Sequence, residues 1–392
     1  MSWELVKLDD VCEIVGGTTP RTNNPDYWNG DIVWLSPVDL PEIGTITSVM
    51  DSGRKITELA VKESGLRILP INTVVFSTRA SIGKIGIVGT PLTTNQGFNS
   101  LIPSNKVDSL FLAYALKSNI ENISQLGNST TFKEVSRSSF KEFKIPLPPL
   151  STQKHIAAIL DTADALRRKD QELLRKYDEL AQAIFIDMFG DPVKNEKGWE
   201  IRKLGDICYS VKDGPHVSPK YTEQGVPFIS VNNIIRGEID IANCRYISEE
   251  DFKIYSSKGK PEKNDILYTK GGTTGFAKRV DVDFKFINWV HIAVLKFNQK
   301  EMNSIFFESM LNSIYCYRQS QKYTRGIANR DLVLGEMKKI EILYPPYKIQ
   351  CRFANLIENI EIERKYIINT CSKSDSLFQS LLQKAFKGEL IS

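Results

Sequence analysis

Glycine-rich polar loops recur along the chain, and their side chains are of types that bind phosphates and the edges of bases. They are residues 16–24, 77–84 and 93–96 in the first part of the chain, and residues 212–216, 269–275, 278–279 and 322–330 in the second. Arg and Lys suit phosphate oxygens, while Ser, Thr and Asn suit both phosphates and base edges. Any one loop is equally well explained as an ordinary surface turn. Their recurrence at matching places, with different side chains, favours two binding surfaces built on one plan.

Catalytic and metal-binding motifs of the usual kinds are missing from the sequence. The six cysteines include no Cys-x-x-Cys pair and the three histidines lie far apart, so we expect free thiols and no metal centre. The Gly-Lys step in residues 81–86 lacks the flanking residues of a phosphate-binding loop. Asp265 with residues 283–285 is the nearest approach to a nuclease carboxylate cluster, and such spacing is common by chance. We therefore predict no catalytic residue.

Size and composition are those of a soluble protein with two or three domains. The chain has 392 residues, of which 41% are hydrophobic and 25% charged. A net charge of +4 indicates only a mild preference for polyanions. No apolar run approaches the roughly 20 residues of a membrane-spanning helix. Glu4, Asp9 and Asp10 stand where a signal peptide would be basic and then apolar, so we expect a cytoplasmic protein without membrane contact.

The chain contains a long internal repeat. Residues 3–12, from Trp3 to Cys12, recur as residues 199–208, from Trp199 to Cys208. The pair Pro148-Pro149, followed by Gln153, is echoed by Pro345-Pro346, followed by Gln350. Because the register drifts by only one residue over this distance, the two halves are predicted to share one architecture.

Each proline pair is followed by a long stretch that contains neither Pro nor Gly. These stretches predict two helices over residues 151–189 and 348–387, with Gly190 and Gly388 as stop signals. Each would be about 58 Å long at roughly 1.5 Å per residue. Apolar residues at heptad spacing predict a narrow seam for one partner helix. The seam residues are Ile156, Ile159, Ala163, Leu166, Leu173, Tyr177, Leu180 and Ile184, then Phe353, Leu356, Ile360, Ile367, Leu377 and Leu381. Alternatively, each helix packs across its own globular domain.

The blocks between the helices mix short β-branched or aromatic runs with turn residues, which predicts an α+β domain in each half. The predicted strands are residues 32–35, 74–76, 227–231, 266–268 and 291–297, and the predicted helices are residues 110–120 and 305–317. The resulting domain order is a globular domain over 1–150, a helix over 151–190, a second globular domain over 191–346 and a second helix over 347–392. The fold class is therefore α+β with a two-fold sequence repeat.

Several segments together resemble the specificity subunit of type I restriction-modification systems, over the full length of the chain. Residues 16–40, from Gly16 to Leu40, and residues 213–231, from Asp213 to Val231, are similar to openings of target-recognition domains in that family. Residues 148–156, 188–192 and 380–390 are similar to its helical regions. One departure lies at residues 344–351, where Tyr347 and Ile349 replace the usual leucine and glutamate.

The resemblance implies a subunit without catalytic activity or a cofactor of its own. Two target-recognition domains would be separated by two long antiparallel coiled-coil helices with pseudo-twofold symmetry, and each would read one half of a split target in double-stranded DNA. The helices would set the spacer between the half-sites and dock two modification subunits, which use S-adenosylmethionine to methylate adenine. Two restriction subunits, which use ATP and Mg, would complete the nuclease.

The DNA contacts that we predict lie in the polar loops. They are Thr18, Arg21, Arg79, Lys84, Lys270, Thr273, Lys278, Arg279, Lys322, Arg325 and Arg330. Two other classes of protein remain open. One is a nuclease or methyltransferase fused to recognition domains, and the other is a scaffold protein with no role at DNA. A neighbouring gene for an adenine methyltransferase would favour the specificity subunit over the scaffold.

Overall fold

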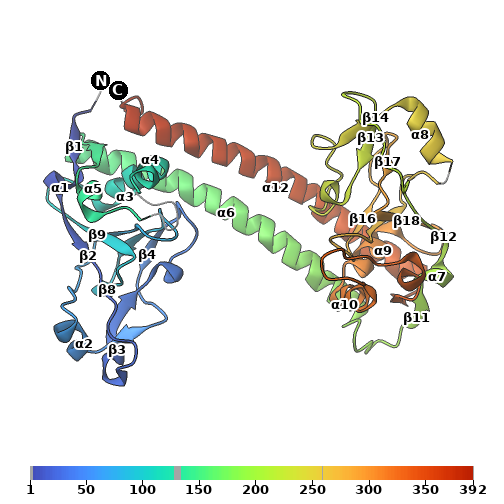
Figure 1. The fold of residues 1–392 in the computed structure, drawn as a ribbon, viewed down its shortest axis with the longest axis horizontal. Helices are drawn as coiled ribbons and strands as arrows, with labels where there is room; N and C mark the ends of the chain where they lie inside the picture. Colours follow the sequence, from blue (N-terminus) through green and yellow to red (C-terminus); the bar gives the residue numbers. More distant parts are fainter. Residues whose placement is uncertain (1–2, 128–133, 258, 392) are drawn as a thin grey trace. The chain divides into compact units, whose positions relative to one another are not determined.

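The computed structural model describes residues 3–127, 134–257 and 259–391. The chain divides into two compact units: unit 1 comprises Met1–Glu172 with Asn369–Ser392, and unit 2 comprises Leu173–Ile368. Helix α6 (Leu150–Phe189) leads from unit 1 into unit 2, and helix α12 (Tyr347–Lys387) returns from unit 2 to unit 1 (Figure 1). The two helices therefore run in opposite directions, and each unit contains a part of both.

Unit 1 is built on a five-stranded sheet with the order β2-β9-β6-β7-β4, beside a three-stranded sheet β5-β3-β8 and the pair β1-β10. Its strands are β1 (Leu5–Lys7), β2 (Cys12–Gly16), β3 (Trp28–Leu35), β4 (Ile46–Val49), β5 (Lys55–Ile56), β6 (Val74–Ser77), β7 (Ile85–Val88), β8 (Leu92–Thr94), β9 (Phe98–Pro103) and β10 (Lys144–Pro146). Its short helices are α1 (Leu8–Val11), α2 (Glu58–Glu63), α3 (Ser109–Ser118), α4 (Ile120–Gln125) and α5 (Arg137–Lys141).

Unit 2 repeats this plan with a four-stranded sheet β12-β18-β15-β16, a three-stranded sheet β14-β13-β17 and the pair β11-β19. Its strands are β11 (Glu200–Lys203), β12 (Cys208–Asp213), β13 (Val226–Ile229), β14 (Arg245–Ile247), β15 (Ile266–Thr269), β16 (Ala277–Arg279), β17 (Ile287–Asn288), β18 (Ile292–Phe297) and β19 (Glu341–Tyr344). Its short helices are α7 (Leu204–Ile207), α8 (Glu249–Ser256), α9 (Ser304–Leu311), α10 (Ile314–Tyr323) and α11 (Leu334–Met337).

The predicted elements occur in the structure with small shifts. The five predicted strands overlap β3, β6, β13, β15 and β18, although residues 230, 231 and 291 lie outside them, and the helix predicted over residues 110–120 overlaps α3. The single helix predicted over residues 305–317 is instead two helices, α9 and α10. The break has a local cause, because Asn312 bonds the backbone of Ala277 at 2.8 and 2.9 Å and the Ser313 hydroxyl accepts from the Cys316 amide.

The two long helices begin in the same way, and the repeated glutamine explains why. Gln153 donates from Nε2 to the carbonyls of Lys106 and Pro148 at 2.9 and 2.8 Å, and it accepts from the Asp108 amide at 2.9 Å. Gln350 repeats this arrangement by accepting from the Asn303 amide at 2.8 Å and donating to the carbonyls of residues 301 and 345. Each buried glutamine thus fixes the first turn of its long helix to the turn that precedes α3 or α9.

The predicted seam of the helices is partly wrong. Ile156 on α6, and Phe353, Ile360 and Ile367 on α12, are buried as expected. The predicted seam leucines at 166, 173 and 180 are instead 49%, 38% and 46% exposed, and those at 356 and 377 are 39% and 51% exposed. The inward positions on α6 include Leu160, Asp164, Arg167, Asp170 and Leu174. A purely apolar pattern misses this stripe because ion-paired charges occupy it.

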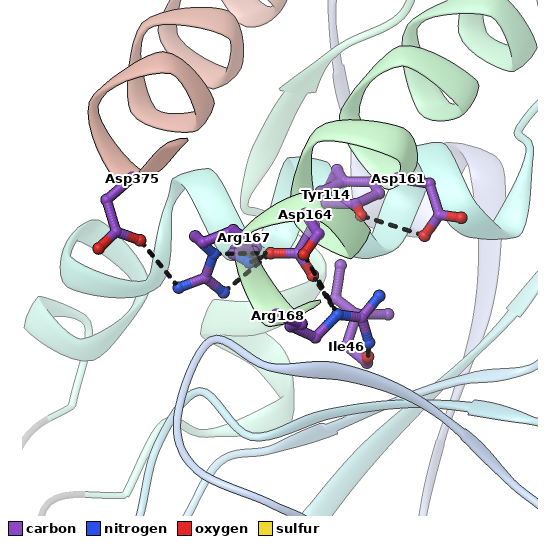
Figure 2. A network of polar contacts seen from close by, with 8 residues as sticks. Ile46, Tyr114, Asp161, Asp164, Arg167, Arg168 and Asp375 are labelled. Atoms are coloured by element: carbon purple, nitrogen blue, oxygen red, sulfur yellow. Dashed lines mark hydrogen bonds and ion pairs between the residues drawn. The ribbon is translucent and has the colours of Figure 1, made fainter. Parts of the chain in front are cut away.

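A buried ion network joins α6 to the rest of unit 1 (Figure 2). The carboxylate of Asp164, which is fully buried, lies 3.1 Å from Lys117 of α3, 2.9 Å from Arg167 and 3.2 Å from Arg168. Arg167 also reaches Asp375 of α12 at 3.5 Å. One carboxylate thus connects α3, α6 and, through Arg167, α12.

Candidate nucleic-acid interface

The polar loops predicted in unit 1 lie together at one end of its main sheet. Strands β2 and β6 end at Gly16 and Ser77, and β9, which lies antiparallel between them, begins at Phe98. The Thr18 amide donates to the Thr94 carbonyl at 2.9 Å. The Thr78 amide donates to the Gly97 carbonyl at 2.8 Å. Backbone hydrogen bonds therefore hold the three loops 17–24, 78–84 and 93–97 side by side.

Unit 2 brings its own three loops together in the same way. Strands β12 and β15 end at Asp213 and Thr269, and β18 begins at Ile292. The Lys270 amide donates to the His291 carbonyl at 2.8 Å. A side chain at Gly214 would place its Cβ 1.9 Å from the Asn288 carbonyl oxygen, so only glycine permits this approach of the two loops.

A fourth loop joins this end of the sheet in each unit. In unit 1 the Val135 amide donates to the Thr78 carbonyl at 2.9 Å, and in unit 2 the Leu332 amide donates to the Lys270 carbonyl at 2.7 Å. Isolated bridges between Arg79 and Glu134, and between Gly271 and Asp331, repeat the same contact. Four loops from distant parts of the sequence thus form one surface in each unit, which we call the loop surface.

The fourth loop of unit 2 is a closed hairpin with an apolar residue at its tip. The amides and carbonyls of Arg325 and Asp331 exchange two hydrogen bonds of 2.9 Å. Gly326 has a φ of +80°, and a Cβ there would lie 2.3 Å from the Asn329 carbonyl oxygen. Within this tight loop Ile327 is 100% exposed and Asn329 is exposed. Sequence reasoning missed both residues, although an isoleucine inside a basic, glycine-containing loop was a visible signal.

Six predicted contact residues are placed where DNA could reach them. Thr18, Arg21 and Thr273 are exposed, and so is Lys322 at the end of α10. The side chains of Arg79 and Arg325 are 50% and 71% exposed, each with one long ion pair, to Glu134 at 3.6 Å and to Glu336 at 3.6 Å. Pairs of this kind contribute little stability, so both guanidinium groups can exchange their partner for a phosphate.

Three further predicted residues lie at the loop surface and are already bonded within the protein. Lys84 donates to the carbonyls of Pro37 and Leu40 at 2.8 and 2.9 Å. Lys270 is buried between Asp213 at 3.5 Å and Asp331 at 3.1 Å. Arg330 donates to Gln321 and lies 3.5 Å from the hydroxyl of Thr274. These cations hold neighbouring loops together, and their contact with DNA stays a prediction.

The last two predicted residues, Lys278 and Arg279, lie on β16 and face helices. Lys278 is 4% exposed, 2.9 Å from Asp281 and 3.5 Å from Glu308 of α9. Arg279 lies 3.8 Å from both Glu308 and Glu361 of α12. Burial alone would lower the pKa of Lys278, but Glu308 and Asp281 outweigh it and the pKa is raised. Both cations are neutralised by carboxylates, and a role at DNA stays a prediction for them too.

Other chemistry predicted from the sequence can be placed in the described part of the chain. All six cysteines are free, and Cys12, Cys208 and Cys316 are buried. Burial raises the pKa of the Cys12 thiol to about 12, so it is un-ionised at neutral pH. Over residues 3–127, 134–257 and 259–391, no group of three or more His, Cys, Asp or Glu side chains is arranged to hold a metal ion. Within the same ranges, every helix is too short or too polar to cross a membrane.

The chain is similar in sequence to known proteins over most of its length. The family described as the type I restriction modification DNA specificity domain matches residues 1–175 and again residues 196–370. The specificity subunit of the type I restriction enzyme MjaIX from Methanocaldococcus jannaschii is 33% identical over 378 residues, which cover 91% of this chain and 86% of that subunit. The EcoKI specificity subunit of Escherichia coli strain K12 is 24% identical over 368 residues, covering 84% of this chain and 77% of that one.

Solved structures show the same fold. The S subunit of a type I restriction-modification system from M. genitalium superimposes with a TM-score of 0.62 at 16% identity, covering 98% of this chain and 96% of that one. A chain from a structure of assembly in the type I restriction-modification system gives a TM-score of 0.56 at 17% identity, with 99% and 98% covered. The family domain matches the chain twice, and each match contains one loop surface. The match to the MjaIX subunit extends over most of the chain. The chain belongs to the family of type I restriction-modification specificity subunits, with two recognition domains.

Proposed function

We propose that the chain is a non-catalytic reader in which each loop surface recognises one half of a split target in double-stranded DNA. One observation carries this proposal: the same four loops meet at the same end of the sheet in both units. The bonds from Val135 to Thr78 and from Leu332 to Lys270 are equivalent, whereas the exposed side chains of the loops differ. Base edges are read by side chains, so one scaffold with two sets of loops suits two different half-sites.

The long helices suit a spacer between the half-sites. With 40 and 41 residues, α6 and α12 are each about 60 Å long at roughly 1.5 Å per residue. At about 34 Å per helical turn of DNA, such a length spans just under two turns, so it could hold half-sites about one to one and a half turns apart. The number of unspecified base pairs would then depend on the helices rather than on the loops.

The catalytic steps would reside in partner subunits in the cytoplasm. Two modification subunits would dock on the helices and use S-adenosylmethionine, and two restriction subunits would use ATP and Mg. Exposed apolar side chains on the helices support docking, because Leu166, Leu173 and Leu180 follow one another at seven-residue intervals along α6 and are each more than a third exposed. The two-fold repeat supports a pair of related docking sites.

The decisive experiment is to co-express the chain with its modification subunit and to sequence the methylated adenines of the host DNA. We expect a split motif with a fixed gap. Replacing residues 196–346 with the matching domain of another specificity subunit should change one half of the motif and leave the other half intact. Methylation at a short unsplit site, or none from a well-folded complex, would contradict the proposal and favour a scaffold protein.

Arg79 provides a local test of the loop surface in unit 1. Its guanidinium is half exposed and its pair with Glu134 is long, so Arg79→Ala should leave the fold intact. If Arg79 contacts a phosphate, the plot of the log binding constant against the log salt concentration should become less steep by about one. The measurement is the affinity of the complex with the modification subunit for target DNA at several salt concentrations. Arg175→Ala, which removes an exposed cation of α6, is the matched control; an equal slope in both variants would remove Arg79 from the interface.

A further inference from the structure

Unit 2 contains a groove at a place where unit 1 has larger, buried side chains. It has a volume of about 920 Å³ and lies among α9, the last turns of α6 and the first turns of α12. Phe185, Phe353 and Ile357 line its apolar part, and Ala181, Ser309 and Asn312 contribute small or polar side chains. Three exposed apolar residues stand at the edge, Ile186, Ile314 and Tyr317, with 51%, 54% and 45% of their surfaces accessible.

The internal repeat identifies the equivalent residues in unit 1. The bond from the Asp108 amide to the Gln153 side-chain oxygen matches the bond from the Asn303 amide to the Gln350 side-chain oxygen. The ring contact of Phe111 with Phe386, at 5.4 Å, matches the contact of Phe306 with Phe189, at 4.7 Å. These matches relate α3 to α9, α6 to α12, and the end of α12 to the end of α6. In this register Ala181, Ser309 and Asn312 correspond to Phe378, Tyr114 and Lys117.

In unit 1 these three larger side chains fill the site. Phe378 is fully buried, with its ring centroid 6.3 Å from that of Tyr114. The Lys117 ammonium lies 4.3 Å from the centre of the Phe378 ring, and the Arg167 guanidinium lies 5.3 Å from it. The structure of unit 1 thus shows that an aromatic ring covered by cations fits this position.

Unit 2 keeps one of the two cations of the site, has Asn312 in place of Lys117, and lacks the ring. Arg364 corresponds to Arg167 and pairs with Asp178 at 2.8 Å, just as Arg167 pairs with Asp375 at 3.5 Å. Arg364 also lines the groove, so a cation is in place to cover an aromatic ring there. In addition, four carboxylates line the groove, those of Asp178, Asp191, Glu308 and Glu361, against the single cation of Arg364. Lys278 and Arg279 pair with Glu308 and Glu361 from behind, which leaves four carboxylates against three cations around the groove.

We propose that this groove is a docking site for an aromatic side chain carried on a basic segment of the modification subunit. The inference rests on the proposed function, because it takes the modification subunit as the partner. The apolar floor with Arg364 selects the ring, and the remaining excess of one carboxylate favours a basic neighbour of that ring. Because Phe378 occupies the matching place in unit 1, the two halves of the chain bind the modification subunit with unequal affinity.

The test is to fill the groove with the residues of unit 1. Ala181→Phe and the double variant Ala181→Phe/Ser309→Tyr are compared with the unaltered full chain by titration with purified modification subunit, with stoichiometry followed by native mass spectrometry. The unaltered chain should bind two modification subunits in two unequal steps. The filled variants should weaken the tighter step by about tenfold or more and leave the weaker step unchanged. Ala158→Phe, an exposed position on α6 in unit 1, is the matched control and should behave like the unaltered chain.

The outcomes separate this inference from the proposed function. A split methylation motif together with equal affinities at both steps, or with affinities unaffected by Ala181→Phe, would overturn the groove as a docking site and leave the reader function in place. Two other results would also overturn the inference. If the unaltered chain self-associates and Ala181→Phe does not, the occupant is a second copy of the chain. If the modification subunit displaces nothing but Ala181→Phe loses a bound small molecule, the occupant is that molecule. Thermal unfolding of each variant checks that the chain is folded. If a filled variant has a lowered unfolding temperature, the milder variant Ala181→Leu takes its place in the titration.

Discussion

Asp164→Asn is expected to destabilise unit 1 by about 3 kcal/mol, the lower end of the range for removing one partner of a buried ion pair. The Asp164 carboxylate is fully buried and contacts Lys117, Arg167 and Arg168, as Figure 2 shows for the two arginines. Asparagine keeps the size of the side chain and removes its charge. Lys117, whose side chain is only 9% exposed, would then be left without its carboxylate, although the arginines retain access to solvent.

Hydrogen exchange can measure this effect separately in each unit. Amides of α3 and of residues 150–170 should exchange faster in Asp164→Asn, whereas those of α9 should be unchanged. Glu361→Gln is the matched control, because Glu361 occupies the equivalent position in unit 2 but is one-third exposed and 3.8 Å from Arg279. Glu361→Gln should increase the exchange of amides in unit 2 by less than Asp164→Asn increases it in unit 1. Equal protection of α3 in Asp164→Asn and the unaltered chain would show that the network contributes no stability.

The same carboxylate gives a pH dependence with a defined sign. Burial raises the pKa of Asp164, but Lys117 and Arg167 outweigh it, so the pKa lies below its ordinary value of 3.8. A carboxyl whose pKa is lower in the folded chain stabilises the fold at every pH above the unfolded value, and this stabilisation is lost as the pH falls through the folded value. The stability difference between the unaltered chain and Asp164→Asn should therefore be complete at pH 7 and narrow below about pH 4. A stability difference that stayed constant down to pH 2 would show that the charge of Asp164 is not its cause.

Ile327→Ala and Asn329→Ala are expected to relax recognition at one or two base pairs of the half-site read by unit 2. Both residues are exposed at the tip of a hairpin closed by Arg325 and Asp331. An isoleucine side chain can contact the methyl group of thymine, and an asparagine amide can pair with N6 and N7 of adenine. Each contact contributes roughly 1–3 kcal/mol of discrimination, which corresponds to about 5- to 150-fold.

The measurement is the methylated motif produced by each variant together with the modification subunit. Sites with a changed base at one position of the second half-site should become methylated, while the first half-site stays unchanged. Ile254→Ala, which removes a 64% exposed isoleucine from α8, is the matched control and should leave the motif unaltered. An unchanged motif in both tip variants, with full methylation, would show that the hairpin tip does not read bases.

The sequence alone was sufficient for the repeat, the two long helices and the family. The limits of the helices are local signals, since Pro148-Pro149 and Gly190 bracket α6, and Gly190 has a φ of +78° that ends the helix. Five strands were also predicted, those that overlap β3, β6, β13, β15 and β18, because short β-branched or aromatic runs between turn residues mark a strand to within a few positions. Such features depend on neighbouring residues, which is why they can be found without a structure.

Tertiary structure alone decided which charged residues face inward and which loops meet. Asp164 and Arg167 occupy the helix seam because Lys117 and Asp375, which are distant in sequence, compensate their charges. Lys278 has the sequence context of an exposed loop cation, yet it is buried against Glu308. The groove of unit 2 likewise depends on Ala181 of α6 and Ser309 of α9 meeting in one lining. A pairing between distant residues leaves no periodic signal in one sequence, so these features appear only when the chain is folded.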